Sequence, residues 1–218
     1  GAKISLYSAG EESIASMPNI KVGKFITQVI LQNIEVEDID LSNATDLRSA
    51  WVQNNPALQK LDLSYSTIWG QGDKETEGNG TYGSSLMVLG CPILKEIKLP
   101  EKNELKAYRI DIECLDALET FDMSNVKMVA ELSIGDLNKD FNLVYPELTI
   151  FYSEDGYAGT YFACSENTFY RESTQAFLKA NYTDIDPDDT VRRLGYTSSL
   201  SYDKNKGCRW RTLLNKQK

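Results

Sequence analysis

Apolar and polar positions recur in a fixed order along the middle of the chain. The segment NPALQKLDLS, residues 55–64, is followed 36 residues later by CPILKEIKLP, residues 91–100, with the same apolar skeleton. Both segments contain L-x-x-Φ-x-L, in which Φ is a large apolar residue and the last three positions alternate apolar, polar, apolar. Alternation with a period of two is typical of a strand that buries one face. The pattern therefore predicts short strands that recur along the chain.

Five copies of this skeleton follow one another. Their apolar positions are Val36, Ile39 and Leu41; Leu58, Leu61 and Leu63; Leu94, Ile97 and Leu99; Leu118, Phe121 and Met123; and, in degraded form, Leu148, Phe151 and Ser153. The first residues of the copies are separated by 22, 36, 24 and 30 positions. Strands this short cannot form a sheet alone, so successive copies are expected to bury one another's apolar edges, as repeats do in a solenoid.

The segments between the copies predict how the chain returns. WGQGDKETEGNGTYGSS, residues 69–85, is rich in glycine without apolar periodicity, which predicts a surface loop inserted into one repeat. Residues 47–54 and 84–90 indicate short helices or turns. Residues 107–112 and 130–134 indicate more extended segments. A second layer behind the short strands is therefore expected.

The two ends of the chain carry no clear copy. Residues 3–8 and 24–31 predict strands that could cover the first repeat, and residues 173–182 predict a helix. We therefore expect an N-terminal cap over residues 1–33, a repeat domain over residues 34–152, and a C-terminal cap or small subdomain over residues 153–218. Caps are needed because the outermost apolar edge of a solenoid would otherwise face water.

The repeats resemble leucine-rich repeats, and residues 91–100 resemble the repeat of BspA-like bacterial surface proteins, C-x-x-L-x-x-I-x-I-P. A second cysteine, Cys114, follows Cys91 by 23 residues, as that pattern expects. Leu118, however, is four rather than three residues after Cys114. The other copies lack the cysteine, and the A-F pair that should precede it is missing.

Three segments, DLSNAT, DLSYST and DMSNVK, resemble instead the L-x-L-S-x-N turn of other leucine-rich repeats, although Ala44, Ser66 and Val126 replace its asparagine. The resemblance covers about residues 34–152. It implies an α/β leucine-rich-repeat solenoid with a short-stranded parallel sheet on one face and irregular, helical or extended segments on the back, capped at both ends. Ordinary amphipathic strands of an unrelated fold are the alternative.

Composition excludes several kinds of chemistry. The chain has no histidine, which removes Ser-His-Asp and Cys-His nucleophile pairs, His-ligated zinc and imidazole acid–base catalysis. The net charge of -9 argues against a nucleic-acid partner. Residues 204–218 are the exception, with six basic residues and no acid, and they indicate either a solvated tail or an anion-binding tail.

The cellular compartment of the protein is inferred from the start of the sequence and from the cysteines. No transmembrane segment is expected, because no run of residues is apolar enough. Gly1 stands where an initiator Met is expected, so we expect that an export signal has been removed. Together with the resemblance, this predicts a secreted or cell-surface bacterial protein. Cys164 and Cys208 could pair in an oxidising compartment, with buried free thiols as the alternative.

One acidic segment mimics the opening of a calcium-binding loop. Asp184, Asp186 and Asp188 have the D-x-D-x-D spacing, but Asp189 stands where glycine is needed and Gly195 where the bidentate glutamate belongs. Helix capping and turn formation are the alternative to a weak calcium site. We expect no cofactor and no metal.

Outward-pointing residues of stacked strands form columns on one face. The central column is Asp40, Asp62, Lys98, Asp122 and Tyr152, flanked by residues of the neighbouring positions. Leucine-rich-repeat proteins generally bind partners on this face, so the resemblance implies a mixed-charge, acid-biased binding surface. The residues that we expect to contact the partner are Asp38, Asp40, Lys60, Asp62, Ser64, Glu96, Lys98, Thr120, Asp122 and Tyr152. The alternative is that these residues only keep the sheet face solvated.

The sequence thus predicts a non-catalytic recognition or adhesion module that binds a protein, with a glycan as the second ligand class. A structural or scaffold component of the bacterial cell envelope is one alternative. A carboxylate-dependent glycoside hydrolase is another, since Asp40 and Asp62 on adjacent strands would have about the 5 Å separation of a retaining pair. An open sheet face, however, offers little desolvation to raise a pKa. The oligomeric state stays open.

Overall fold

The structure is a computed structural model. It describes residues 1–8, 14–71, 83–138, 140–149, 153–154, 157–158, 161–181 and 212–215. Most strands in these residues pair in parallel, and helices are few. This arrangement fits the predicted α/β class.

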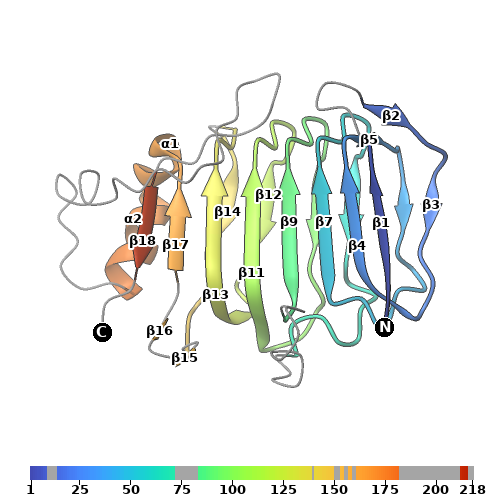
Figure 1. The fold of residues 1–218 in the computed structure, drawn as a ribbon. Coiled ribbons are helices and arrows are strands. Elements are labelled where there is room, and N and C mark those ends of the chain that lie inside the picture. Colours follow the sequence, from blue (N-terminus) through green and yellow to red (C-terminus); the bar gives the residue numbers. More distant parts are fainter. Residues whose placement is uncertain are drawn as a thin grey trace.

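One large sheet runs through the described residues (Figure 1). Its strands, in spatial order, are β1 (Ala2–Tyr7), β4 (Ile26–Gln32), β7 (Ser49–Gln53), β9 (Ser85–Leu89), β11 (Leu105–Glu113), β13 (Val126–Gly135), β17 (Tyr161–Cys164) and β18 (Thr212–Asn215). Each of the first six pairs in parallel with the next, whereas β18 pairs antiparallel with β17. The spatial order is the chain order, so each long strand is added beside the previous one.

Short strands accompany the large sheet; in Figure 1, β12 and β14 lie behind it, whereas β2 and β3 lie beside its β1 edge. They are β2 (Ala15–Ser16), β3 (Ile20–Lys21), β5 (Ile34–Glu35), β6 (Ile39–Asp40), β8 (Lys60–Asp62), β10 (Glu96–Lys98), β12 (Thr120–Asp122) and β14 (Asn142–Val144). They pair in parallel as β2 with β5, β3 with β6, β8 with β10 and β12 with β14. From β4 to β14 the chain therefore alternates between the long strands and the short strands.

The remaining elements follow at the C-terminal side. Strands β15 (Ser153–Glu154) and β16 (Tyr157–Ala158) pair antiparallel. Helices α1 (Glu166–Phe169) and α2 (Glu172–Asn181) come directly after β17. Helix α2 confirms the helix predicted for residues 173–182, and it contributes Phe177 and Leu178 to the core.

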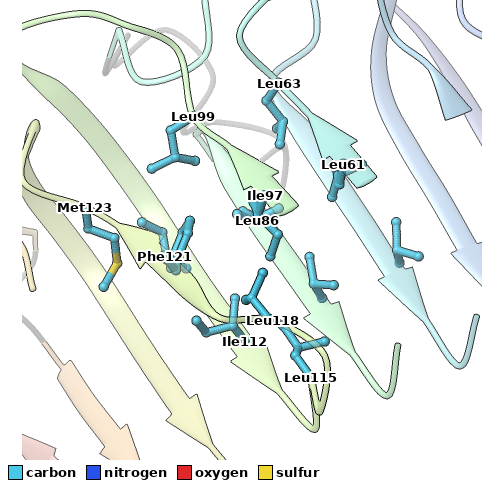
Figure 2. Packing of buried hydrophobic residues seen from close by; sticks show 14 of the residues in the cluster. Leu61, Leu63, Leu86, Ile97, Leu99, Ile112, Leu115, Leu118, Phe121 and Met123 are labelled. Atoms are coloured by element: carbon cyan, nitrogen blue, oxygen red, sulfur yellow. The ribbon is translucent and has the colours of Figure 1, made fainter. Parts of the chain in front are cut away.

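The hydrophobic core lies between the two layers of strands. Figure 2 shows Leu61, Ile97 and Phe121 of the short strands facing Leu86 and Ile112 of the long strands. All five are buried and belong to one continuous cluster. Because side chains of a strand alternate between its faces, β6, β8, β10 and β12 contribute their apolar positions to this cluster and keep their charged positions outside.

Five of the long strands are each followed, at equivalent positions, by a residue in the left-handed backbone conformation. Asn33, Asn54, Gly90, Cys114 and Asp136 have φ angles of 54°, 54°, 64°, 49° and 42°. The amides of the first four donate to the last carbonyl of the next long strand at 2.9 to 3.1 Å. The ladder therefore extends one residue past the strand before the chain turns. Glycine, asparagine and aspartate tolerate this conformation best.

This register explains the imperfect cysteine pattern in the sequence. Cys114 occupies the left-handed position of Gly90, and Leu115, not Cys114, is the counterpart of Cys91. Leu118 is three residues after Leu115, as Leu94 is after Cys91, and both amides donate back to the residue three before. The repeat spacing is thus intact, although the cysteine is displaced by one position.

Two predicted elements are wrong. Residues 47–54 and 84–90 were expected to be short helices or turns, but they contain strands β7 and β9 of the large sheet. Both strands carry large apolar side chains on their outer face as well, Trp51 and Met87, beside the inward Val52 and Val88. The period-two alternation is therefore hidden.

The other predicted strands are confirmed. Residues 3–8 and 24–31 overlap β1 and β4, and the extended segments 107–112 and 130–134 lie in β11 and β13. The division into caps and a repeat domain at residues 33 and 153 stays a prediction.

The fifth copy of the repeat is wrong. The strand beside β12 is β14, in which Leu143 pairs with Phe121, and not the segment that begins at Leu148. Asp140 stands where the leading leucine of the skeleton was expected, which explains why the strand was missed. Phe151 lies outside the described residues.

The predicted insert at residues 69–85 lies only partly within the described residues. Residues 72–82 lie outside the described residues, but both flanks belong to the framework. Trp69 is fully buried, and its Nε1 donates to the carbonyl of Ser85 at 3.4 Å. The amide of Gly70 donates to Ser84 Oγ at 2.6 Å. The assignment of Trp69 to a surface loop is therefore wrong.

Candidate functional site

The short-strand face, formed by the outward residues of β6, β8, β10 and β12, carries the predicted columns. Lys60 lies opposite Glu96, and Asp62 opposite Lys98, in the register of β8 and β10. Asp40 pairs with Lys21 of β3. The ladder thus contains two of the predicted neighbour pairs, whereas Val144, and not the predicted Tyr152, lies opposite Asp122.

Ion pairs within and between β8 and β10 neutralise the centre of this face. Lys60 Nζ is 3.2 Å from Asp62 Oδ2 and 3.2 Å from Glu96 Oε2. Lys98 Nζ is 3.2 Å from Glu96 Oε1. Two ammonium groups thus alternate with two carboxylates. Exposed pairs of this kind each contribute only about 0 to 1 kcal/mol, so the network mainly fixes where the charges lie.

The aspartates of the central column also shape the turns that follow the strands. Asp40 Oδ1 accepts from the amide of Ser42 at 2.9 Å, and Asp122 Oδ1 accepts from the amide of Ser124 at 2.8 Å. Asp62 Oδ1 accepts from both the amide and the hydroxyl of Ser64, at 3.0 and 2.5 Å. Each Asp-x-Ser segment is therefore a turn closed by the aspartate side chain. These residues have a structural role whether or not they bind a partner.

The same contacts keep two of these carboxylates ionised. Hydrogen bonds from Ser42 lower the pKa of Asp40, with help from Lys21. Burial acts to raise the pKa of Asp62, but the hydrogen bonds from Ser64 and the ammonium of Lys60 outweigh it and the pKa is lowered. Neither carboxyl is suited to donate a proton as the general acid of a glycosidase.

Two of the remaining predicted partner-binding residues, Asp38 and Thr120, are exposed. Asp38 is exposed, and its amide donates to Asn19 Oδ1 at 3.2 Å. Thr120 is exposed and lies opposite Asn142 of β14. Tyr152 lies outside the described residues. The structure thus brings together Lys60, Asp62, Ser64, Glu96 and Lys98.

Sequence reasoning missed a second group of polar residues, on the outer face of the large sheet. The ladder places one row of residues across five strands, pointing away from the core: Ile30, Trp51, Met87, Asp111 and Ser133. Asp111 is 0% exposed, and Glu113, two residues later on the same face, is 2% exposed. We call Arg109, Asp111, Glu113 and Glu131 the outer carboxylate cluster.

One arginine forms ion pairs with two carboxyl groups of this cluster. Arg109 Nη2 is 2.8 Å from Asp111 Oδ2, and Nη1 is 3.6 Å from Glu131 Oε2. Tyr108 donates its hydroxyl to Glu131 Oε1 at 3.3 Å. Asp111 Oδ1, Glu113 Oε1, Arg109 Nε and the nearby Trp51 Nε1 are buried without a hydrogen-bond partner in the part of the chain that the structure describes.

Burial decides the protonation of the two inner carboxyls. It raises the pKa of Glu113 to about 11, and the negative charge of Asp111 and a hydrogen bond with that residue add to the shift. Burial also raises the pKa of Asp111, although Arg109 opposes it. The pair therefore holds a proton at neutral pH.

A signal for this cluster was present in the sequence. Residues 109–113, RIDIE, alternate charged and apolar residues within a segment already expected to be extended. Such alternation places Arg109, Asp111 and Glu113 on one face of the strand. What the sequence could not show is that this face is buried.

Two of the cysteines that the structure describes are free thiols, and a third is in a disulfide. Cys91 and Cys164 are free and buried, and burial raises the pKa of each thiol to about 12. The Cys164–Cys208 pairing considered from the sequence is therefore not formed. Cys114 is disulfide-bonded.

Two predicted features cannot be placed. The acidic segment with Asp184, Asp186 and Asp188 lies outside the described residues, as do all six basic residues of 204–218. Within the ranges that the structure covers, no three Cys, Asp or Glu side chains gather as a metal site would require. No helix in these ranges has the length and apolar character needed to cross a bilayer.

The chain was compared with known proteins in three ways. A scan against protein-family models, a search of curated proteins and a search of solved structures each gave no match.

Proposed function

We propose that this protein is a non-catalytic recognition or adhesion module whose short-strand face binds a protein partner, with a glycan as the second ligand class. The proposed architecture is a leucine-rich-repeat solenoid of the BspA-like type. Its support is the alternation of long and short parallel strands, together with the repeated L-x-x-Φ-x-L skeleton from which β6, β8, β10 and β12 are built.

The observation that carries the proposal is the fixed charge pattern on β8 and β10. Lys60, Asp62, Glu96 and Lys98 are held by ion pairs within and between the two strands, and Asp62 is held in addition by Ser64. A partner that binds here meets side chains that are already ordered, so little conformational entropy is lost on docking. Alternating charges also favour a partner with the complementary order and disfavour others.

Location outside the cytoplasm fits the cysteine chemistry. A disulfide at Cys114 is typical of proteins in an oxidising compartment. We therefore infer that the protein is secreted or displayed on a bacterial cell surface, in agreement with the resemblance of its repeats.

Partner capture from bacterial-envelope and host-surface extracts tests the proposal. The variant Lys60→Ala/Lys98→Ala removes the two ammonium groups of the face and leaves the Asp-x-Ser turns intact. Replacing Asp62 or Asp122 would be a poor test, because either change also breaks a turn. The control, Lys3→Ala/Lys24→Ala, removes the same charge from two exposed positions elsewhere.

The proposal expects a partner that is captured by the wild type and the control and lost by the Lys60/Lys98 variant. Equal capture by all three proteins would show that the partner binds a surface other than the short-strand face. Capture of nothing by the wild type would favour a structural role in the cell envelope.

A further inference from the structure

The outer face of the large sheet carries an aromatic residue beside buried polar groups. Trp51 of β7, Met87 of β9 and Asp111 of β11 lie in one row on adjacent strands. In the neighbouring row Gln53, Leu89 and Glu113 follow the same order. This surface belongs to the opposite layer from the short-strand face (Figure 1), so what it binds is independent of the function proposed above.

We propose that the outer face of β7, β9 and β11 is a carbohydrate-binding site built on Trp51, Asp111 and Glu113. The chemistry of the unpartnered atoms carries this inference. Asp111 Oδ1 and Glu113 Oε1 can accept hydrogen bonds, whereas Arg109 Nε and Trp51 Nε1 can only donate them. Buried polar atoms without partners cost about 1 to 3 kcal/mol each, so a ligand that pairs with them gains that energy.

A sugar matches this set better than an ion does. An ammonium group only donates hydrogen bonds, so it leaves Arg109 Nε and Trp51 Nε1 unpaired and is repelled by the guanidinium. A carboxylate or phosphate only accepts, and it is repelled by Asp111 and Glu131. Hydroxyl groups donate and accept and carry no charge. The carbon-bound face of a sugar ring also packs on apolar surface of the kind that Trp51 and Met87 provide.

The size of the site sets the size of the ligand. Trp51 and Asp111 are two strands apart, which is about 9 to 10 Å at the usual strand spacing. One sugar ring does not span that separation, so the site takes an oligosaccharide of at least two rings. Asp111 and Glu113 are closed off in the structure, whereas the Arg109 and Glu131 side chains are 31% and 35% exposed. The ligand enters as Arg109 changes rotamer, a kind of rearrangement that is common at binding surfaces.

A glycan array probed with the intact chain tests the inference. The wild type is compared with Trp51→Ala, Asp111→Asn and the control Glu119→Gln, which removes one carboxylate from an exposed position next to the short strands. We expect the wild type and the control to bind the same oligosaccharides. Both site variants should bind them about ten-fold or more weakly in titration calorimetry, because each loses a buried contact with the ligand.

Two outcomes would overturn the inference. One is a wild type that binds no glycan on the array, and the other is a bound glycan whose affinity is unchanged in both site variants. Because Trp51 lies outside the core cluster, Trp51→Ala keeps the test valid even if Asp111→Asn changes folding, which melting curves of every variant would show. Failure here leaves the Lys60/Lys98 experiment unaffected, since it concerns other residues and the other layer.

Discussion

Replacing Glu113 with glutamine should change how stability depends on pH. Glu113 is 2% exposed, and its pKa is raised to about 11 in the folded protein, against about 4.3 in an unfolded chain. Between these two values the folded state binds one more proton than the unfolded state. The free energy of unfolding therefore falls as pH rises through this range, by up to about 1.4 kcal/mol per pH unit. Between pH 6 and pH 8 this one group is expected to cost up to about 2.7 kcal/mol.

The range from pH 6 to pH 8 suits this measurement. The chain has no histidine, so no imidazole titrates between pH 6 and pH 8. Glutamine has nearly the shape of a protonated glutamate and does not titrate, and it leaves Asp111 with a neutral neighbour. Glu113→Gln should therefore flatten the pH dependence and make the protein more stable than the wild type at pH 8.

Urea unfolding followed by far-ultraviolet circular dichroism, at one-unit intervals from pH 5 to pH 9, measures both slopes. Asp116→Asn, which alters an exposed carboxyl, is the matched control and should follow the wild type. A wild type whose stability is constant between pH 6 and pH 8 would refute the reasoning. So would a Glu113→Gln variant that keeps the slope of the wild type, because the proton would then be held elsewhere.

Three further predictions concern the framework. Asp62→Ala should lower the free energy of unfolding by about 1 to 2 kcal/mol, since the amide and hydroxyl of Ser64 lose their acceptor; urea unfolding that matches the wild type would contradict a turn role. Trp69→Ala should lower the free energy of unfolding by about 3 to 5 kcal/mol in the same assay, because Trp69 is fully buried. A loss below about 1 kcal/mol would indicate that Trp69 lies in a surface loop. The Cys91 and Cys164 thiols should resist alkylation at pH 8 until the chain unfolds, because burial raises the pKa of each to about 12; rapid labelling of the native protein, detected by mass spectrometry, would contradict their burial.

The short strands could be predicted because they bury one face only. Leu61 and Ile97 lie inside while Lys60, Asp62, Glu96 and Lys98 lie outside, and this contrast is visible as period-two alternation. Where both faces carry large apolar side chains, as in β7 and β9, the alternation disappears. The sequence then suggested helices or turns that the structure does not have.

The candidate sites were predictable to different degrees. The column that contains Asp62 and Lys98 follows directly from stacking repeats in register. That Asp62 also closes a turn could not be foreseen from the column, because it depends on a hydrogen bond with Ser64. The burial of Asp111 and Glu113 could not be foreseen either, since it depends on what surrounds the outer face and not on their own strand.

The contact between Gly70 and Ser84 makes the pairing of the framework strands independent of the length of the segment between these two residues. The chain leaves the framework at Gly70 and returns at Ser84, where the backbone amide of the first meets the hydroxyl of the second. Ser49 and Ser85 remain paired neighbours although they are 36 positions apart in the sequence. The closure cost of such a segment grows only slowly with its length. A foreign peptide or a whole small domain could therefore be inserted between residues 72 and 82 without shifting the pairing of β7 with β9, which makes this junction a natural position for displaying new sequence.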